Sequence, residues 1–194
     1  MTKQELRNKY KFLRQELDDA TIDDLSGACF SNLFANFDLT NKLVGIFLPI
    51  QAKKEPNTFL LFTEFLKEKT SYFAPKIDVG LDALNFYPIQ NLDYIALGPY
   101  QIPEPLSEEK IELNKLNIIL IPLFCFDSKG NRVGYGKGYY DRLLENSPQH
   151  LVKIGISLFD EIEIIDDVRD NDIPLDYAIT PKKMIQFARE KKSR

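Results

Sequence analysis

Glycines and charged residues alternate between residues 127 and 141, and these residue types could bind and transfer a phosphoryl group. Four of the nine glycines lie between residues 130 and 138, and glycine lets a backbone turn tightly and approach a ligand closely. Arg132 and Lys137 supply positive charge, while Asp127 and Asp141 could hold a hard cation such as Mg²⁺. The stretch therefore predicts a phosphate-binding loop.

The established phosphate-loop patterns do not match this loop. A Walker A loop needs Ser or Thr after its Gly-Lys pair, whereas Gly138 follows Lys137. The glycines at 134, 136 and 138 are also spaced differently from those of a dinucleotide-binding Gly-x-Gly-x-x-Gly motif. A flexible surface loop with solvated charges therefore remains open as an alternative. The paired tyrosines Tyr139 and Tyr140 and the flanking aspartates disfavour it.

The segments on either side of the loop predict where it lies in the fold. Residues 117–123 form a continuous apolar run and predict a buried strand, and residues 139–145 predict the start of a helix. A strand, a glycine-rich loop and a helix in this order place the loop at the carboxyl end of a sheet. Open α/β folds bind their ligands at that edge.

The rest of the chain predicts helices alternating with short apolar strands. We expect helices over residues 2–17, 22–37 and 58–68, and a rigid proline-containing loop over 98–107. The expected strands cover residues 43–48, 71–74, 84–87, 151–157, 177–180 and 184–187. This alternation predicts the α/β class, with three α/β/α layers around a largely parallel, Rossmann-like open sheet. The length of 194 residues predicts one domain, residues 1–194.

The first predicted helix carries two cations on one face. Thr2 and Glu5 form a possible capping box, and Leu6, Tyr10, Leu13 and Leu17 form its apolar stripe. Lys3 and Arg7 are four residues apart and so lie side by side near the helix start. Taken alone, they could be a solvated basic edge.

The composition excludes several classes of function. The net charge of −4 argues against a nucleic-acid partner, but a locally basic cleft could still take an anionic small molecule. No apolar run is long enough to span a bilayer, and the charged N-terminus is no signal peptide. Cys29 and Cys125 lie among apolar residues and predict core thiols in a reducing cytoplasm. His150 is the only histidine; its polar surroundings predict exposure, so a multi-histidine site is excluded.

The loop and its surroundings resemble the 5-formyltetrahydrofolate cyclo-ligase family, also called methenyltetrahydrofolate synthetases. The most distinctive match covers residues 122–142. Shorter matches follow the order of the family over nearly the whole chain. They lie at residues 3–7, 46–48 with 55–58, 101–105 and 171–176. The loop at residues 51–54 is about two residues longer than is usual in the family, and Asn57 stands where the family usually has an acid.

The resemblance implies a reaction that depends on ATP and Mg²⁺. It converts 5-formyltetrahydrofolate to 5,10-methenyltetrahydrofolate and releases ADP and phosphate. Transfer of the γ-phosphoryl group to the formyl oxygen would activate the carbon for attack by N10. Phosphoryl transfer relies on positioning and charge neutralisation and needs no protein nucleophile. The partner would be a reduced folate, and we expect a monomer in the cytoplasm.

The resemblance also assigns roles to individual residues. Arg132 and Lys137 would neutralise the transferring charge, and Asp141 and Asp172 would bind the metal. The nucleotide would contact Lys3, Arg7, Arg132, Val133, Gly134, Tyr135, Gly136, Lys137, Gly138, Tyr139 and Tyr140. The folate would contact Leu48, Glu55, Tyr135, Gly136, Lys137, Gly138 and Tyr139. Without the resemblance, Asp141 could equally be a paired surface residue of a helix, and Asp172 a turn aspartate.

Two other functions remain open on the same fold. A sugar-phosphate isomerase-like enzyme would need a general base but no ATP. A non-catalytic module that binds a nucleotide or a folate would keep the core and lose the charged loop residues. Because Lys3, Arg7, Arg132, Lys137 and Asp141 are all present, the binding module is disfavoured.

Overall fold

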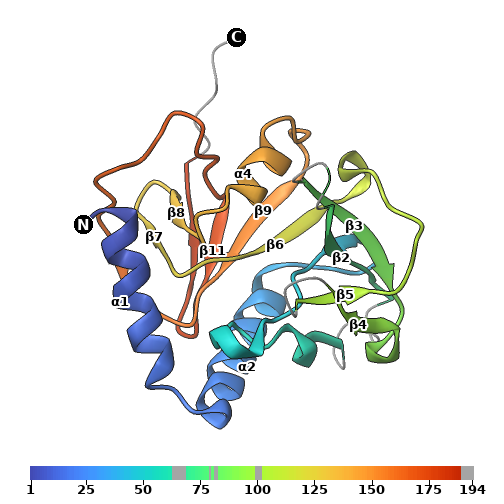
Figure 1. The fold of residues 1–194 in the computed structure, drawn as a ribbon, viewed down its shortest axis with the longest axis horizontal. Helices are drawn as coiled ribbons and strands as arrows, with labels where there is room; N and C mark the ends of the chain where they lie inside the picture. Colours follow the sequence, from blue (N-terminus) through green and yellow to red (C-terminus); the bar gives the residue numbers. More distant parts are fainter. Residues whose placement is uncertain (63–68, 79, 81–82, 99–101, 189–194) are drawn as a thin grey trace.

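The computed structural model describes residues 1–62, 69–78, 80, 83–98 and 102–188. A seven-stranded sheet in the order β12-β11-β9-β6-β1-β2-β3 lies at its centre (Figure 1). The sheet is parallel from β11 to β2, and its two edge strands are antiparallel. This confirms the predicted largely parallel α/β sheet. The parallel strands are β1 (Leu43–Gly45), β2 (Ser71–Asp78), β6 (Ile118–Pro122), β9 (Val152–Ile156) and β11 (Tyr177–Ile179), and the edge strands are β3 (Ala83–Ile89) and β12 (Met184–Gln186).

The central strand β6 explains why helices cover both faces of the sheet. All five of its residues are buried, and successive side chains of a strand point to opposite faces. Ile118 and Leu120 pack in a cluster with residues of α2 (Asp19–Asn36). Ile119 and Ile121 pack in a second cluster that includes Leu144 of α4 (Tyr139–Leu144). The two helices therefore lie on opposite sides of the sheet (Figure 1), as a buried parallel sheet requires.

A small sheet beside the main one supports the first helix. Strands β10 (Ile162–Glu163), β7 (Cys125–Asp127) and β8 (Arg132–Val133) form this sheet in the order β10-β7-β8. Helix α1 (Lys3–Gln15) packs Leu6 and Tyr10 against Phe124 and Val133. The predicted capping box of Thr2 and Glu5 begins this helix. The packing brings the start of α1 next to the glycine-rich loop.

The β7–β8 hairpin was not predicted. The glycine-rich loop is entered from β8 and not directly from the long apolar strand β6. Gly130 lies in the turn of the hairpin with a φ of +86°. A side chain there would meet the carbonyl oxygen of Leu175 at 2.9 Å, so this turn requires glycine.

Several predicted boundaries differ from the structure. Helix α2 begins at Asp19 and not at residue 22, because the Asp18 side chain accepts a hydrogen bond from the backbone N–H of Thr21 at 2.8 Å. The prediction of a loop over residues 98–107 is wrong in part, since β5 (Pro103–Pro105) pairs with β4 (Ile95–Leu97) in a two-stranded sheet. Prolines are tolerated there because each strand has an unpaired side.

The remaining elements are short. The predicted strand at residues 71–74 continues through Pro75 to the end of β2, and the predicted strand at 43–48 ends with β1 at Gly45. Asn57 caps a 3-10 turn at the start of the predicted helix over 58–68, of which residues 63–68 lie outside the described residues. In the described part of the chain, no helix has the length and apolarity needed to cross a bilayer. Among the described residues, the 3-10 turns are η1 (Gln51–Lys53), η2 (Thr58–Leu60), η4 (Leu92–Tyr94) and η6 (Leu113–Lys115).

Candidate active site

A pocket of about 670 Å³ opens where three neighbouring parallel strands end. Phe47 and Leu48 follow β1, Pro75 and Ile77 belong to the second half of β2, and Pro122 is the last residue of β6. Strands β2, β1 and β6 are adjacent in the sheet. The pocket therefore lies at the carboxyl edge of the sheet, where open α/β folds bind ligands.

The structure brings nearly all of the predicted site residues to this pocket. Asp127 and Val133 are the exceptions. The Asp127 carboxylate does not line the pocket and accepts hydrogen bonds from the N–H groups of Lys129 and Asn131 in the β7–β8 turn. The side chain of Val133 is fully buried against Leu6 and Phe124. Its carbonyl accepts a hydrogen bond from the N–H of Phe124 at 2.8 Å, so it anchors the loop to the core. The predicted residues that line the pocket are Lys3, Arg7, Leu48, Glu55, Arg132, Gly134, Tyr135, Gly136, Lys137, Gly138, Tyr139, Tyr140, Asp141 and Asp172.

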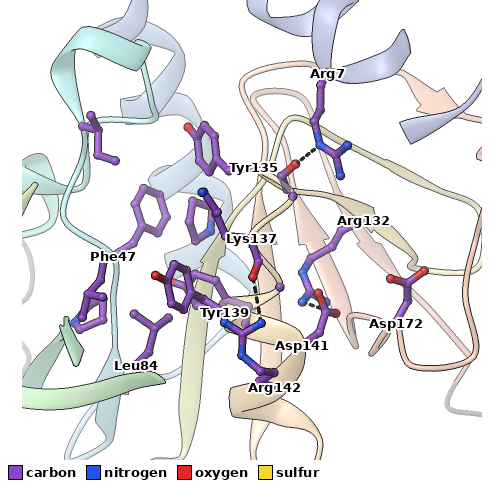
Figure 2. A pocket seen from close by; sticks show the side chains of 18 of the residues that line it. Arg7, Phe47, Leu84, Arg132, Tyr135, Lys137, Tyr139, Asp141, Arg142 and Asp172 are labelled. Atoms are coloured by element: carbon purple, nitrogen blue, oxygen red, sulfur yellow. Dashed lines mark hydrogen bonds and ion pairs between the residues drawn. The ribbon is translucent and has the colours of Figure 1, made fainter. Parts of the chain in front are cut away.

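The glycine-rich loop adopts a backbone that needs glycine at two positions. Gly136 has a φ of +88°, and Gly138, which precedes α4, has a φ of +69°. A side chain at Gly136 would also come within 3.1 Å of the guanidinium carbon of Arg7. The Nε of Arg7 donates a hydrogen bond to the carbonyl of Gly134 at 2.8 Å (Figure 2). Helix α1 thus places Arg7 against the loop and Lys3 beside Asp172, in contrast to the alternative of a solvated basic edge.

Charged side chains gather on one side of the pocket. Figure 2 shows Arg132, Asp141 and Asp172 on the side opposite Phe47. The Nη2 atom of Arg132 lies 2.8 Å from the Oδ1 atom of Asp141, and Lys3 forms an ion pair with Asp172. Burial lowers the pKa of Arg132, and the nearby Asp141 carboxylate opposes this effect. Both aspartates are therefore part of a charged cluster that faces the pocket.

The two aspartates could take part in binding Mg²⁺ together with a phosphate ligand. Asp141 uses Oδ1 for its contacts with Arg132 and the N–H of Ile173, and Asp172 uses Oδ2 for its contacts with Lys3 and the N–H of Arg169. Each carboxylate thus uses one oxygen for contacts within the protein and leaves its second oxygen available to a metal ion.

A metal site built from protein ligands alone is not found in the described residues, where no group of three or more His, Cys, Asp and Glu side chains is arranged around one point. Mg²⁺ commonly binds to one or two carboxylates, substrate phosphates and water. The pair of Asp141 and Asp172 fits such a shared site.

The opposite side of the pocket is apolar and contains one buried acid. Phe47 and Leu84 lie on this side in Figure 2, and Leu48 and Ile77 also line the pocket. Glu55 is 4% exposed and accepts a hydrogen bond from the N–H of Ile50 at 2.6 Å. Burial raises the pKa of Glu55, although its hydrogen bonds and nearby cations act in the opposite direction. A flat ligand with N–H groups would find here both apolar contact and a hydrogen-bond acceptor.

Sequence reasoning missed several charged residues of the pocket. Arg142 donates from Nη1 to the carbonyl of Lys137 at 2.9 Å, and its guanidinium lies 5.1 Å from the ring of Tyr139. The Nζ of Lys53 lies 4.3 Å from the centre of the Tyr135 ring. Asp167 and Arg169 line the pocket beside the predicted metal ligands.

The missed residues differ in how detectable they were. Arg142 could have been identified as a pocket residue, because it directly follows the predicted metal ligand Asp141 in the same helix. Lys53 lies in the lengthened loop and gave no signal, because only the fold brings it over Tyr135.

Comparisons with a family model, with individual proteins and with solved structures all match this chain to the same family. The model of the 5-formyltetrahydrofolate cyclo-ligase family matches residues 1–181. A probable 5-formyltetrahydrofolate cyclo-ligase of Schizosaccharomyces pombe is 31% identical over 151 residues, which are 69% of this chain and 72% of the relative. The 5-formyltetrahydrofolate cyclo-ligase of Mycoplasma genitalium is 28% identical over 89% of this chain and 95% of the relative. The NMR structure of Aquifex aeolicus 5,10-methenyltetrahydrofolate synthetase superposes with a TM-score of 0.78 at 29% identity, covering 100% of this chain and 97% of that one.

Proposed function

The chain belongs to the 5-formyltetrahydrofolate cyclo-ligase family, and on that premise we propose that it converts 5-formyltetrahydrofolate to 5,10-methenyltetrahydrofolate at the expense of ATP. The observation that carries the proposal is the division of the pocket into a charged side and an apolar side, with the glycine-rich loop between them (Figure 2). The reaction needs a polyphosphate to lie next to a pterin, whose ring faces can pack on apolar side chains and whose edges carry N–H groups. The two sides of the pocket suit these two ligands.

The proposed reaction has two bond-forming steps. The formyl oxygen of the folate attacks the γ-phosphorus of ATP, and the bond to ADP breaks. N10 then attacks the activated formyl carbon and loses its proton, and the carbon–oxygen bond breaks to release phosphate, which takes up that proton. The formyl oxygen therefore leaves in the phosphate, and the carbon bridges N5 and N10. No redox change occurs, and no protein nucleophile is required.

The cations around the loop would neutralise the charge on the transferring group. Lys137 and Arg132 would act on the γ-phosphoryl group, and Lys3 and Arg7 would bind the other phosphates from α1. Preorganised charges of this kind stabilise a phosphoryl-transfer transition state because they need no rearrangement during the reaction. Mg²⁺, held by Asp141 and Asp172, would supply further neutralisation of the phosphate charge.

The apolar side would hold the folate. Leu48 and Phe47 offer apolar contact, Tyr139 offers an aromatic ring, and the Glu55 carboxylate can accept hydrogen bonds from pterin N–H groups. The exposed His150 has no place in this scheme, in line with a mechanism that needs no histidine.

Formation of the methenyl product tests the proposal. The pure protein is mixed with 5-formyltetrahydrofolate, ATP and Mg²⁺, and absorbance at the methenyl band is followed over time. We expect product only in the complete mixture. Product at an undiminished rate without nucleotide, or in excess chelator, would exclude the phosphoryl-transfer mechanism. Turnover of a sugar phosphate without ATP would instead favour the isomerase alternative.

A further inference from the structure

Arg14 is a fully buried cation that does not line the pocket. It belongs to the last turn of α1 and is 2% exposed. Its Nη2 atom donates to the carbonyl of Leu123 at 2.7 Å, and its guanidinium carbon lies 4.6 Å from the centre of the Phe124 ring. These two contacts could serve the fold alone. A third contact, from Nη1 to the hydroxyl of Tyr135 at 3.1 Å, leads toward the pocket.

The hydroxyl of Tyr135 connects Arg14 to Glu55. A guanidinium can only donate hydrogen bonds, so the hydroxyl accepts from Arg14 and directs its own proton to the Glu55 carboxylate, with which it also hydrogen-bonds. The Tyr135 ring is held by Phe124, at 4.9 Å between ring centres, and by the ammonium of Lys53. The ring and the direction of its O–H bond are both fixed by these contacts.

We propose that Arg14 is a positioning residue for folate recognition, which acts through the Tyr135 hydroxyl to hold the Glu55 carboxylate in place and in its charged form. The inference rests on the proposed function, because it assigns Glu55 to the folate. A carboxylate accepts hydrogen bonds with both oxygens, whereas a protonated carboxyl uses one oxygen as a donor. Only the charged form of Glu55 can therefore accept one N–H group from the ligand with each of its two oxygens and present no O–H donor.

The electrostatic surroundings of Glu55 support this role. Burial raises the pKa of Glu55, while the hydrogen bond from Tyr135 and the charges of Arg14 and Lys53 lower it. Tyr140 also faces Glu55, and burial raises the pKa of this tyrosine, so its neutral ring adds no charge. Arg14 is the only one of these cations that is buried, and solvent screens it least. Its removal should thus shift Glu55 further toward the protonated form.

The test compares Arg14→Met, Tyr135→Phe and Arg14→Lys with the parent enzyme across pH. In Arg14→Met and Tyr135→Phe we expect the acidic limb of kcat/KM for 5-formyltetrahydrofolate to move to higher pH by about half a unit or more. The KM for folate should rise by about tenfold at neutral pH, as expected for the loss of one hydrogen bond to a charged group, and the KM for ATP should change little. Arg14→Lys keeps the charge and should show a smaller shift. Glu55→Gln, which cannot titrate at this position, should lose the acidic limb that Glu55 contributes.

A purely structural role for Arg14 predicts a different result. Loss of Arg14 would then lower the unfolding midpoint without moving the pH profile of kcat/KM. The proposal would be overturned if the pH profiles of Arg14→Met and Tyr135→Phe both overlay the profile of the parent. If Arg14→Met does not fold, Tyr135→Phe decides alone, because it removes only the hydroxyl that joins the two charges. An unmoved acidic limb in that variant is then sufficient to reject the inference.

Failure of the inference can be distinguished from failure of the proposed function. The pKa of the Glu55 carboxyl can be followed by NMR of protein labelled with ¹³C at its glutamate carboxyls, with Glu55→Gln to assign the signal. We expect this pKa to rise in Tyr135→Phe whether or not the protein turns over folate. An inactive parent enzyme would reject the proposed function, while an unchanged Glu55 pKa in Tyr135→Phe would reject the role of Arg14.

Discussion

Individual residues of the pocket differ in whether a neighbour already neutralises their charge. Lys3 is paired with Asp172, and Arg132 with Asp141. Among the described residues, no acid lies within ion-pairing distance of the Lys137 ammonium. Figure 2 shows Lys137 between Tyr135 and Tyr139, so its charge lies within the pocket. The charge of Lys137 is thus available to a phosphoryl group, as the proposed mechanism requires.

Lys137→Ala should lower kcat by about a hundredfold or more, the usual loss for one preorganised charge at a transition state. Its stability should change by no more than about 0.5 kcal/mol, as for most surface substitutions. Lys129→Ala is the matched control, because Lys129 is exposed on the nearby β7–β8 turn and does not line the pocket. Turnover and urea unfolding are measured for both variants. Near-normal turnover of Lys137→Ala would show that Lys137 is only a solvated lysine of the loop.

Glu55 should reduce stability at neutral pH. Burial raises its pKa above the ordinary value of 4.5, so over the interval between the two values the native state binds more protons than the unfolded state. Stability then falls as pH rises through this interval, and the loss is complete above the folded pKa.

Glu55→Gln should therefore be more stable than the parent at neutral pH, with a smaller difference below pH 4.5. Urea unfolding of both proteins at an acidic and at a neutral pH checks this prediction. The folate KM of the variant should rise, because the amide carries no charge. If Glu55→Gln were less stable than the parent by the same amount at both pH values, burial would not make the charged Glu55 carboxylate unfavourable.

At the scale of elements, α1 connects the core to the charged side of the pocket. Its apolar face packs on the small sheet, and its first turns place Lys3 and Arg7 at the pocket. Arg7→Ala should raise the KM for ATP by about tenfold or more, since a hydrogen bond to a charged group contributes about 1.5–3 kcal/mol. The KM for folate should change little. Lys11→Ala, an exposed position one turn further along α1, controls for the loss of one positive charge.

Unfolding midpoints of the Arg7→Ala variant and the parent must match, because a shifted helix would mimic a lost contact. An unchanged KM for ATP at matched stability would exclude α1 from the nucleotide site. The glycine-rich loop would then have to bind the phosphates without it.

The long, strongly patterned elements were predictable from the sequence, and the short ones were not. The continuous apolar run of β6 and the capping box of α1 were recognised because each depends on local residues alone. Strands β7 and β8 have three and two residues, too few to show a period of two. Strand β5 was missed because its two prolines favour a loop unless a partner strand is present.

Arg14 shows why the candidate site was only partly predictable. The apolar stripe of α1 suggested that Leu13 and Leu17 would be buried, but both are only partly buried, whereas Arg14 is 2% exposed. Two nitrogens of this buried guanidinium are satisfied because the carbonyl of Leu123 and the hydroxyl of Tyr135 accept their hydrogen bonds, whereas its Nε has no hydrogen-bond partner among the described residues. Those partners lie more than a hundred residues away in the sequence, and only the fold brings them to α1.

At the scale of the whole molecule, the pocket joins segments from nearly the full length of the chain. Lys3 and Asp172 form an ion pair across 169 positions, and Arg7 contacts Gly134 across 127. The charged side and the apolar side lie on either side of one glycine-rich loop (Figure 2). This arrangement would hold two substrates in contact while the sheet edge below them stays fixed.

The fate of the formyl oxygen tests the central claim most directly. 5-Formyltetrahydrofolate labelled with ¹⁸O in its formyl group is converted by the pure protein in unlabelled water with ATP and Mg²⁺. The released phosphate is then analysed by mass spectrometry against the amount of methenyl product. We expect one ¹⁸O atom in the phosphate for each methenyl group and each ADP formed, because the oxygen attacks the γ-phosphorus and leaves with it. Methenyl product accompanied by unlabelled phosphate, or formed without ADP, would contradict the proposed mechanism.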